Sequence, residues 1–433
     1  MEVIRLLQMS DIHWTKQPNA ADDYTDIRNS MIKDLENYCQ ETGNKFDKIL
    51  LCGDIAFSGS KDEYKRANIF INELCEKIDC KPDEVYTVPG NHDKNVNEHP
   101  KCVREFIHTA LCNHDTHIDK LWLSMITEDF TFIKKLYTPF KEYNEFCNNE
   151  RDCAEPFMLS ALDEDIKQYD QSQMYWCYEF DKELNGYKIN LYGINSALTS
   201  DLQDYDTDPQ RQKGHLLYLP KLAYHEAKIH DGVINILMCH HPLDFLLNKE
   251  SIEKDLDKRY ALQLYGHVHL AESNMVNNAV HVYSGALNPG DINDDTYQPV
   301  YNIIELSIDK HEDGEDILNI NLQVRIYNGE CFDEDKKQSK RFCIVLNNHN
   351  TWQKNANVQS VNQEDLPDGV TKRDVRHKFI KHPQGKRIIK QLYPDMDCNG
   401  SAYIRNQAFL NKIRTDNKWL ELYNIMSNEQ NFK

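Results

Sequence analysis

The 433-residue chain has no long apolar run and no excess of positive charge. No stretch approaches the ~20 apolar residues that a membrane span needs, which argues against a membrane protein. Glycine and proline number only 16 and 14, so the composition is neither collagen-like nor that of a disordered chain. The net charge of −20 argues against a protein that coats nucleic acid by charge alone, because an acidic surface repels phosphate backbones.

The chain also lacks any C-x-x-C pair, and its 13 cysteines are scattered and odd in number. In a chain long enough to bury a large core without covalent staples, this pattern indicates reduced thiols. The first eleven residues have no charged start, long apolar middle or small-residue cleavage site, so they do not read as a signal peptide. We therefore expect a cytoplasmic protein.

Short apolar runs alternate with helical patterns as far as about Leu346. Ile27–Tyr38, for example, repeats apolar residues at helical spacing. Eight runs are predicted strands: Val3–Gln8, Lys48–Cys52, Glu84–Val88, Lys188–Gly193, Val233–Cys239, Leu262–Tyr265, Val280–Ser284 and Val300–Ile308. This alternation predicts an α/β fold in which helices cover the faces of the sheets.

Three regions depart from this rhythm. Residues 95–172 are rich in aromatic residues and mostly helical in pattern, which indicates an insertion in a domain that spans 1–346. Residues 347–370 form a polar linker. Residues 371–433 carry 13 basic and 6 acidic side chains, and their apolar residues at helical spacing, such as Trp419 and Leu422, predict a small basic helical module.

The basic module invites two interpretations. The first is that the charges form a solvated face of a folded helical module that recruits or regulates through a protein partner. The apolar residues interleaved with the charges favour this interpretation, because apolar residues need burial in a folded module. Nucleic acid binding is the alternative. No contact with a membrane is expected.

Side chains that can bind metal ions or carry protons follow five of the predicted strands. They are Asp11, His13, Asp54, Asn91, His92, Asp93, His240, His241, His267 and His269. Because ligands bind outside the carboxyl ends of strands in α/β sheets, we expect these groups to converge on one edge. Gly53, Gly90 and Gly266 would allow the backbone to turn sharply beside them.

The donors of this set are carboxylates, an amide and imidazoles, which suit Mn²⁺, Fe, Zn²⁺, Ni²⁺ or Co²⁺ better than a thiolate zinc site would. Seven of these residues are candidate ligands: Asp11, His13, Asp54, Asn91, His240, His267 and His269. Seven ligands exceed one tetrahedral site, so two divalent ions with a shared carboxylate are predicted. Since only two of the ligands are charged, about +2 would remain to attract an anion, and bound water would ionise near neutral pH.

The order of these elements closely resembles the signature of the calcineurin-like metallophosphoesterase superfamily. That signature is D-x-H, G-D, G-N-H-D/E, H and G-H-x-H, and a longer G-D-x-x-x-S-G form spans Gly53 to Gly59. The matching residues are Asp11-Ile12-His13, Gly53-Asp54, Gly90-Asn91-His92-Asp93, His240 and Gly266-His267-Val268-His269. The resemblance covers roughly residues 1–310 and implies a four-layer αββα sandwich, with the helical insertion and the small C-terminal helical domain added to it.

The resemblance also implies the ligand sets. One metal ion would be bound by Asp11, His13 and His269. The other would be bound by Asn91, His240 and His267, with Asp54 bridging the two ions. Manganese is the favoured ion.

The implied chemistry is hydrolysis of a phosphoester by a hydroxide that bridges the metal ions. His92 would protonate the leaving oxygen, and Asp93 would orient His92. His241 would lie behind the ligands, because the H-x-P pattern of the superfamily selects His240 as the ligand.

The H-H-P and G-H-V-H elements look most similar to those of class III cyclic nucleotide phosphodiesterases. The expected function is therefore a phosphodiesterase that acts on a nucleotide or cyclic nucleotide. Two alternatives stay open: a DNA or RNA nuclease of the same superfamily, and a catalytically silent binding or adaptor protein.

Two further groups are predicted to be structural. The insertion contains Cys102, His108, Cys112, His114 and His117, whose spacing matches no closed four-ligand zinc pattern. A second zinc site is the alternative, since His108 and Cys112 are four residues apart and could share a helix face. Asn195 and Ser196 follow a predicted strand and read as a turn, although contact with a substrate is the alternative.

Overall fold

The structure is a computed structural model. It describes residues 2–15, 24–98, 135–147, 175–200, 217–225, 227, 229, 231–288, 298–311 and 315–346, and parts of 366–427. The chain divides into two compact units, residues 1–159 with 173–350 and residues 160–172 with 351–433.

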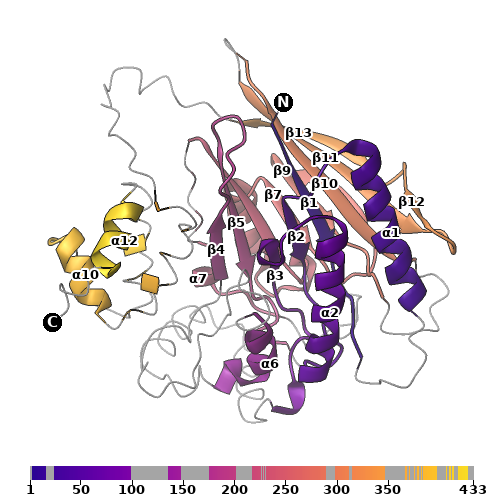
Figure 1. The fold of residues 1–433 in the computed structure, drawn as a ribbon, viewed down its shortest axis with the longest axis horizontal. Coiled ribbons are helices and arrows are strands. Elements are labelled where there is room, and N and C mark those ends of the chain that lie inside the picture. The colour runs from indigo at the N-terminus through magenta and orange to yellow at the C-terminus, as the bar shows by residue number, and fades with distance from the viewer. Residues whose placement is uncertain are drawn as a thin grey trace. The chain divides into compact units, whose positions relative to one another are not determined.

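The first unit contains a seven-stranded sheet (Figure 1). Its order is β12-β11-β10-β1-β2-β3, and β13 also pairs with β11. The strands are β1 (Val3–Met9), β2 (Lys48–Leu51), β3 (Val85–Thr87), β10 (Val300–Asp309), β11 (Asp316–Tyr327), β12 (Phe332–Glu334) and β13 (Lys340–Leu346). The three strands β1, β2 and β3 run parallel, whereas β10 joins β1 in antiparallel fashion.

The second sheet of this unit has six strands in the order β4-β5-β6-β7-β9-β8. They are β4 (Tyr175–Glu179), β5 (Lys188–Ile194), β6 (Val233–Cys239), β7 (Leu262–Tyr265), β8 (Glu272–Val276) and β9 (Ala279–Tyr283). The four central strands run parallel and the two edge strands are antiparallel. Strands β2 and β7 are buried along their whole length, as expected for parallel strands covered on both faces.

Helices cover the outer faces of the sheets. Figure 1 shows α1 (Thr25–Thr42) and α2 (Lys61–Lys77) on the same side of the seven-stranded sheet. At the start of helix α2 the carboxylate of Glu63 accepts a hydrogen bond from the N–H of Ser60 at 3.0 Å. Helix α8 (Lys249–Arg259) contacts the six-stranded sheet through Asp257. Two shorter helices are α6 (Lys141–Glu145) and α7 (Lys221–Tyr224).

The two sheets contact each other through backbone acceptors. The indole of Trp176 in β4 donates to the carbonyl of Thr87 in β3 at 3.2 Å. The amide of Gln8 in β1 reaches the carbonyl of Tyr265 in β7 at 3.3 Å. The layers are therefore helix, sheet, sheet and helix, which confirms the predicted α/β sandwich.

All eight predicted strands are present, and each boundary agrees within one residue. The predicted helix is also present and is longer at both ends. Strands β4, β8, β11, β12 and β13 were not predicted. Four of these five strands lie at or near a sheet edge, where fewer apolar residues are needed.

The described part of the second unit contains α10 (Gly385–Leu392) and α12 (Trp419–Ser427). Ten buried apolar residues form its core, among them Phe409, Ile413, Trp419 and Leu422. Most of the predicted insertion and linker lies outside the described residues. Among the helices that are described, none is both long and apolar enough to cross a membrane.

Candidate metal centre

The candidate ligands lie on five loops that meet at one edge of the two sheets. These loops follow β1, β2, β3, β6 and β7, whose carboxyl ends point to the same side of their sheets. The N–H of Asp11 donates to the carbonyl of Gly53 at 3.0 Å, which joins the first two loops. The N–H of His267 donates to Oδ2 of Asp11 at 3.1 Å and joins the two sheets.

Asp11, His13 and His269 form the first group of donors. Oδ1 of Asp11 lies 3.2 Å from Nε2 of His269 and 3.9 Å from Nε2 of His13. One donor atom from each of the three residues lies within 4.8 Å of the others. This is the set of side chains that the sequence assigns to one metal ion.

Asp54 lies between this group and the second one. Its Oδ2 is 3.3 Å from Nε2 of His13 and 3.2 Å from Nε2 of His240. Asp54 also forms a compact group with Asp11 and His240. The carboxylate of Asp54 thus reaches donors on both sides, and this geometry suits a bridging role.

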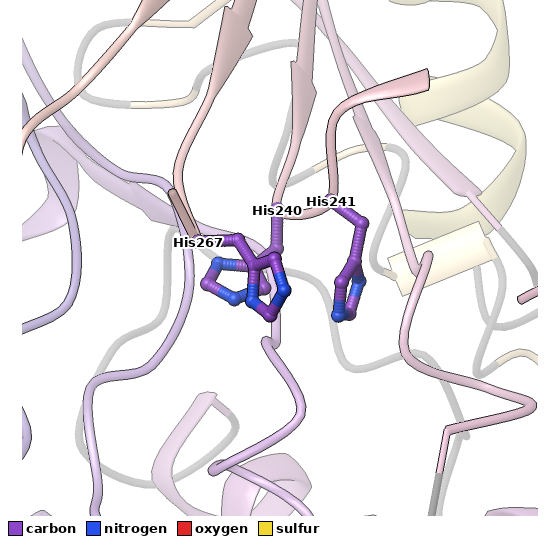
Figure 2. Close-up of side chains that lie close together, drawn as sticks. All are labelled: His240, His241 and His267. Carbon is purple, nitrogen blue, oxygen red and sulfur yellow. The ribbon is translucent and has the colours of Figure 1, made fainter. Parts of the chain in front are cut away.

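His240, His241 and His267 form a second group, and Figure 2 shows their rings projecting in the same direction from neighbouring loops. Nδ1 of His240 lies 2.7 Å from the carbonyl of Cys52, so Nδ1 donates and Nε2 faces Asp54. Nε2 of His241 lies 3.1 Å from Oδ1 of Asn91. The sequence placed His241 behind the ligands; in the structure its ring nitrogens contact Asn91 and Ser196.

Several donor atoms of the cluster are buried without an ordinary hydrogen bond. Within the described residues, these include Oδ1 of Asp11, Nε2 of His240 and Nε2 of His267. An unsatisfied polar atom inside a protein is costly, and such atoms call for a specific partner. Oxygen and imidazole donors held together in this way fit first-row divalent metal ions.

The backbone at these ligands is unusual. Nine described non-glycine residues have positive φ, and five of them are predicted ligands: Asp11, His13, Asp54, His267 and His269. Left-handed conformations of such residues carry strain and occur preferentially at functional sites. The loops therefore hold these side chains in positions that a relaxed backbone would not give.

The motif glycines act differently from the prediction. Only Gly53 of the three has a positive φ, 93°. At Gly90 a Cβ atom would overlap the carboxylate of Asp54, and at Gly266 it would overlap the hydroxyl of Ser10. Gly90 and Gly266 are therefore needed for close approach of the ligand loops, not for a turn.

The charges of the cluster oppose one another. Burial would raise the pKa of Asp54, but His240, His92 and His13 hold it well below its ordinary value. Burial would lower the pKa of His240, but the carboxylates of Asp54 and Asp11 raise it to about 9. Burial and the neighbouring His240 lower the pKa of His267 to about 3. The two carboxylates are thus ionised, whereas His267 is neutral and able to donate a lone pair to a metal ion.

His92 and Asp93 do not form the pair that the sequence predicts. The carboxylate of Asp93 accepts hydrogen bonds from the N–H groups of Ile55, Ala56 and Gly90 and from the hydroxyl of Tyr64. Nδ1 of His92 lies instead 2.8 Å from the carbonyl of Phe57. Asp93 therefore fixes the loops after β2 and β3 to each other, and a backbone carbonyl orients the half-buried His92 ring.

Two residues near the ligands emerge from the structure. The hydroxyl of Ser196 lies 2.8 Å from Nδ1 of His241, so the predicted turn contacts the cluster. Lys94 is fully buried, and its ammonium group donates to the carbonyls of Leu198 and Ser200 at 3.1 and 2.5 Å. The sequence feature that could have identified Lys94 is its position directly after the G-N-H-D motif. The cysteines and histidines of the insertion lie outside the described residues.

Comparison with known proteins identifies the family. The family model of calcineurin-like phosphoesterases matches residues 4–271. An uncharacterized metallophosphoesterase-like protein of Bacillus subtilis (strain 168), YydB, is 26% identical over 328 residues, which is 71% of this chain and 58% of that protein. The chain thus spans less than two thirds of the length of this relative.

Two solved structures are similar at low identity. Vacuolar protein sorting 29 from Cryptosporidium parvum has a TM-score of 0.33 and 12% identity, and the match covers 78% of this chain and 98% of that one. A conserved protein of Streptococcus pneumoniae, described as a predicted phosphoesterase, has a TM-score of 0.28 and 12% identity, with 79% and 99% covered. Because the family model matches more than half of the chain, the protein belongs to the calcineurin-like phosphoesterase family.

Proposed function

We propose that the protein is a metal-dependent phosphohydrolase with two divalent metal ions, and that it cleaves a phosphodiester of a nucleotide or cyclic nucleotide. The observation that supports this most is the convergence of buried, unsatisfied donors around the central carboxylate of Asp54. Manganese is the first ion to test, since the donor set combines hard oxygens with imidazole nitrogens.

The proposed ligands are the seven predicted from the sequence. Asp11, His13 and His269 would hold one ion, Asn91, His240 and His267 the other, and Asp54 both. When bound, such ions supply Lewis-acid charge and lower the pKa of water toward ~7. The chain itself contributes two ionised carboxylates, so the loaded site would keep a positive charge that attracts a phosphoester.

His92 is the proposed acid. Its Nδ1 proton is held by the carbonyl of Phe57, and its backbone N–H donates to Oδ1 of Asp54 at 2.8 Å. In a ring fixed in this way, Nε2 is the atom that would give a proton to a leaving oxygen. The proposed role of Asp93 is to position the loop that carries His92 rather than to contact its ring.

A substrate panel with Mn²⁺ tests this proposal. The panel contains bis-p-nitrophenyl phosphate, cyclic nucleotides, and single- and double-stranded DNA. We expect hydrolysis of the small diesters and its loss with a chelator. Cleavage of DNA alone would indicate a nuclease. No hydrolysis, together with fewer than one metal ion per chain, would indicate a binding protein instead.

The cellular setting and the partner are also proposals. The nine described cysteines form no disulfide, which supports the expected cytoplasmic location. For residues 371–433 we propose a protein partner, because their net charge of +7 differs in sign from that of the other residues, −27. Binding that weakens with salt would support such an electrostatic contact.

A further inference from the structure

The strongest feature that the proposed function does not use is an exposed aromatic ring beside the metal centre. Phe57 follows the G-D element and is 37% exposed. Six large apolar side chains are exposed in the described part of the chain, and Phe57 is the one phenylalanine among them. An isolated apolar side chain on a surface needs no explanation, but this one lies against the residues proposed to do the chemistry.

The ring of Phe57 contacts two residues of the cluster. Its centroid lies 5.2 Å from that of His92, at an interplanar angle of 39°. It lies 6.1 Å from that of His13, almost perpendicular to it. The exposed ring therefore lies directly beside the rings of His92 and His13.

The backbone holds Phe57 in place. Its N–H donates to the carbonyl of Trp14 at 2.9 Å, and its carbonyl accepts from Nδ1 of His92 at 2.8 Å. Both the N–H and the carbonyl of Phe57 are hydrogen-bonded, so its backbone is already ordered. Binding of a ligand to the ring would therefore cost little further loss of backbone entropy.

A second phenylalanine on the other side of the cluster provides a comparison. Phe245 lies 4.5 Å from His267 at an angle of 87°, but it is only 1% exposed. A ring that is covered by protein can support a ligand residue but cannot stack on a substrate. Of the two rings, only that of Phe57 is available for a second planar group.

We propose that Phe57 is a specificity-determining residue, and that its ring is a platform on which a planar leaving group, such as a nucleobase or an aryl ring, stacks while His92 protonates the leaving oxygen. This inference rests on the proposed function, since it presupposes a phosphodiester at the metal centre. Stacking of a base on an aromatic side chain is tolerant of base identity and contributes measurably to binding. Phe57 would therefore favour substrates with a ring on the leaving group without selecting one base.

Two diesters with leaving alcohols of similar acidity test the platform. Thymidylyl-thymidine carries a base on its leaving group, and glycerophosphoglycerol does not. Each is used as a competitor of bis-p-nitrophenyl phosphate hydrolysis by the full chain loaded with Mn²⁺, which gives an inhibition constant whether or not the competitor is cleaved. We expect the wild-type protein to bind the base-bearing diester about tenfold more tightly.

The variants are Phe57→Ala, Phe57→Leu and Phe57→Tyr. Phe57→Ala keeps the backbone carbonyl that orients His92 and should reduce the discrimination to about twofold or less. Phe57→Leu keeps apolar packing on His92 and should also lose it, whereas Phe57→Tyr should retain it. Ile69→Ala, which removes an exposed apolar side chain of α2, is the matched control and should behave as wild type. Metal content should be equal in all variants.

The outcomes separate the two proposals. Absence of bis-p-nitrophenyl phosphate hydrolysis by the wild-type protein would overturn the proposed function and this inference with it. Hydrolysis without preference for the base-bearing diester, or a preference that survives in Phe57→Ala and Phe57→Leu, would overturn only the platform.

Discussion

The described part of the first unit contains two buried clusters of aspartate and histidine, and they differ in how far their polar atoms are hydrogen-bonded. At the metal centre, Nδ1 of His13 and Nε2 of His267 have no hydrogen-bond partner among the described residues. Beneath α8, the carboxylate of Asp257 accepts from Nε2 of His281 and from Gln263, both at 2.9 Å, and from Asn277 at 2.8 Å. The metal centre therefore contains polar atoms without a hydrogen-bond partner, whereas both oxygens of the Asp257 carboxylate accept hydrogen bonds.

The backbone makes the same distinction. Five of the seven proposed ligands have positive φ on loops, but Asp257 and His281 lie within a helix and a strand. A satisfied pair on regular elements stabilises the fold. Unsatisfied donors on strained loops reduce stability and are retained where a ligand needs them. Buried histidine and aspartate alone therefore do not identify a functional site.

The largest effect is expected from removal of the central carboxylate of the metal centre. Asp54→Ala removes the carboxylate between the two groups of donors and should abolish binding of both metal ions and essentially all hydrolysis. Elemental analysis of the purified protein and turnover of bis-p-nitrophenyl phosphate measure the two effects. Asp257→Ala is the matched control from the satisfied cluster and should retain its metal ions. Retained turnover in Asp54→Ala would contradict the bridging role.

The second prediction separates chemistry from metal binding within the same centre. His92→Ala should keep both metal ions but lose ~10²–10⁴-fold in rate on diesters with poor leaving groups, because those need a proton on the leaving oxygen. The rates are compared for p-nitrophenyl and alkyl leaving groups. An equal loss for both would show that His92 is not the acid.

The third prediction concerns the satisfied cluster. Asp257→Ala leaves the buried donors of His281 and Gln263 without this acceptor, which should lower the free energy of unfolding by about 3–5 kcal/mol. A lower midpoint of urea unfolding, with unchanged metal content per folded chain, would show this. Asp255→Ala, on the same helix and partly exposed, should change the midpoint much less. If folded Asp257→Ala lost its metal ions, the cluster around Asp257 would not be purely structural, and the contrast with the metal centre would be wrong.

The smallest effect concerns a paired charge far from the ligands. Lys48, at the start of β2, pairs with Glu84 and lies 5.1 Å from the ring centroid of Tyr178. Burial lowers its pKa from 10.5 to about 8, so between these pH values the unfolded chain binds more protons than the folded one. Stability should therefore rise with pH across that window, by at most about 3 kcal/mol.

Lys48→Met supplies the comparison for this pH dependence. The variant should lack the rise between pH 8 and 10.5 while its metal content at pH 7 stays the same. Urea unfolding at a series of pH values gives the difference between the two proteins. If their stabilities change in parallel with pH, Lys48 does not carry the effect.

Much of the fold could be read from local sequence. Strands β6 and β7 are mostly apolar runs, each with one polar residue, that end at turn-forming residues, and their bounds were predicted without error. Strand β8, with the sequence Glu272–Val276, is a polar edge strand, and its pairing with β9 depends on a neighbour rather than on its own apolar content. From Ile320 to Arg325, strand β11 alternates buried and half-buried residues and could have been predicted from that pattern.

The sequence by itself determined the family and the candidate ligands, because each donor directly follows an apolar strand and the order of the motifs is preserved. The tertiary structure decided how these side chains are used. It joined His92 to the carbonyl of Phe57 rather than to Asp93, and it placed Ser196 on His241. Contacts of this kind form where loops from the two sheets come together. The spacing of residues along the sequence does not predict which loops will be in contact.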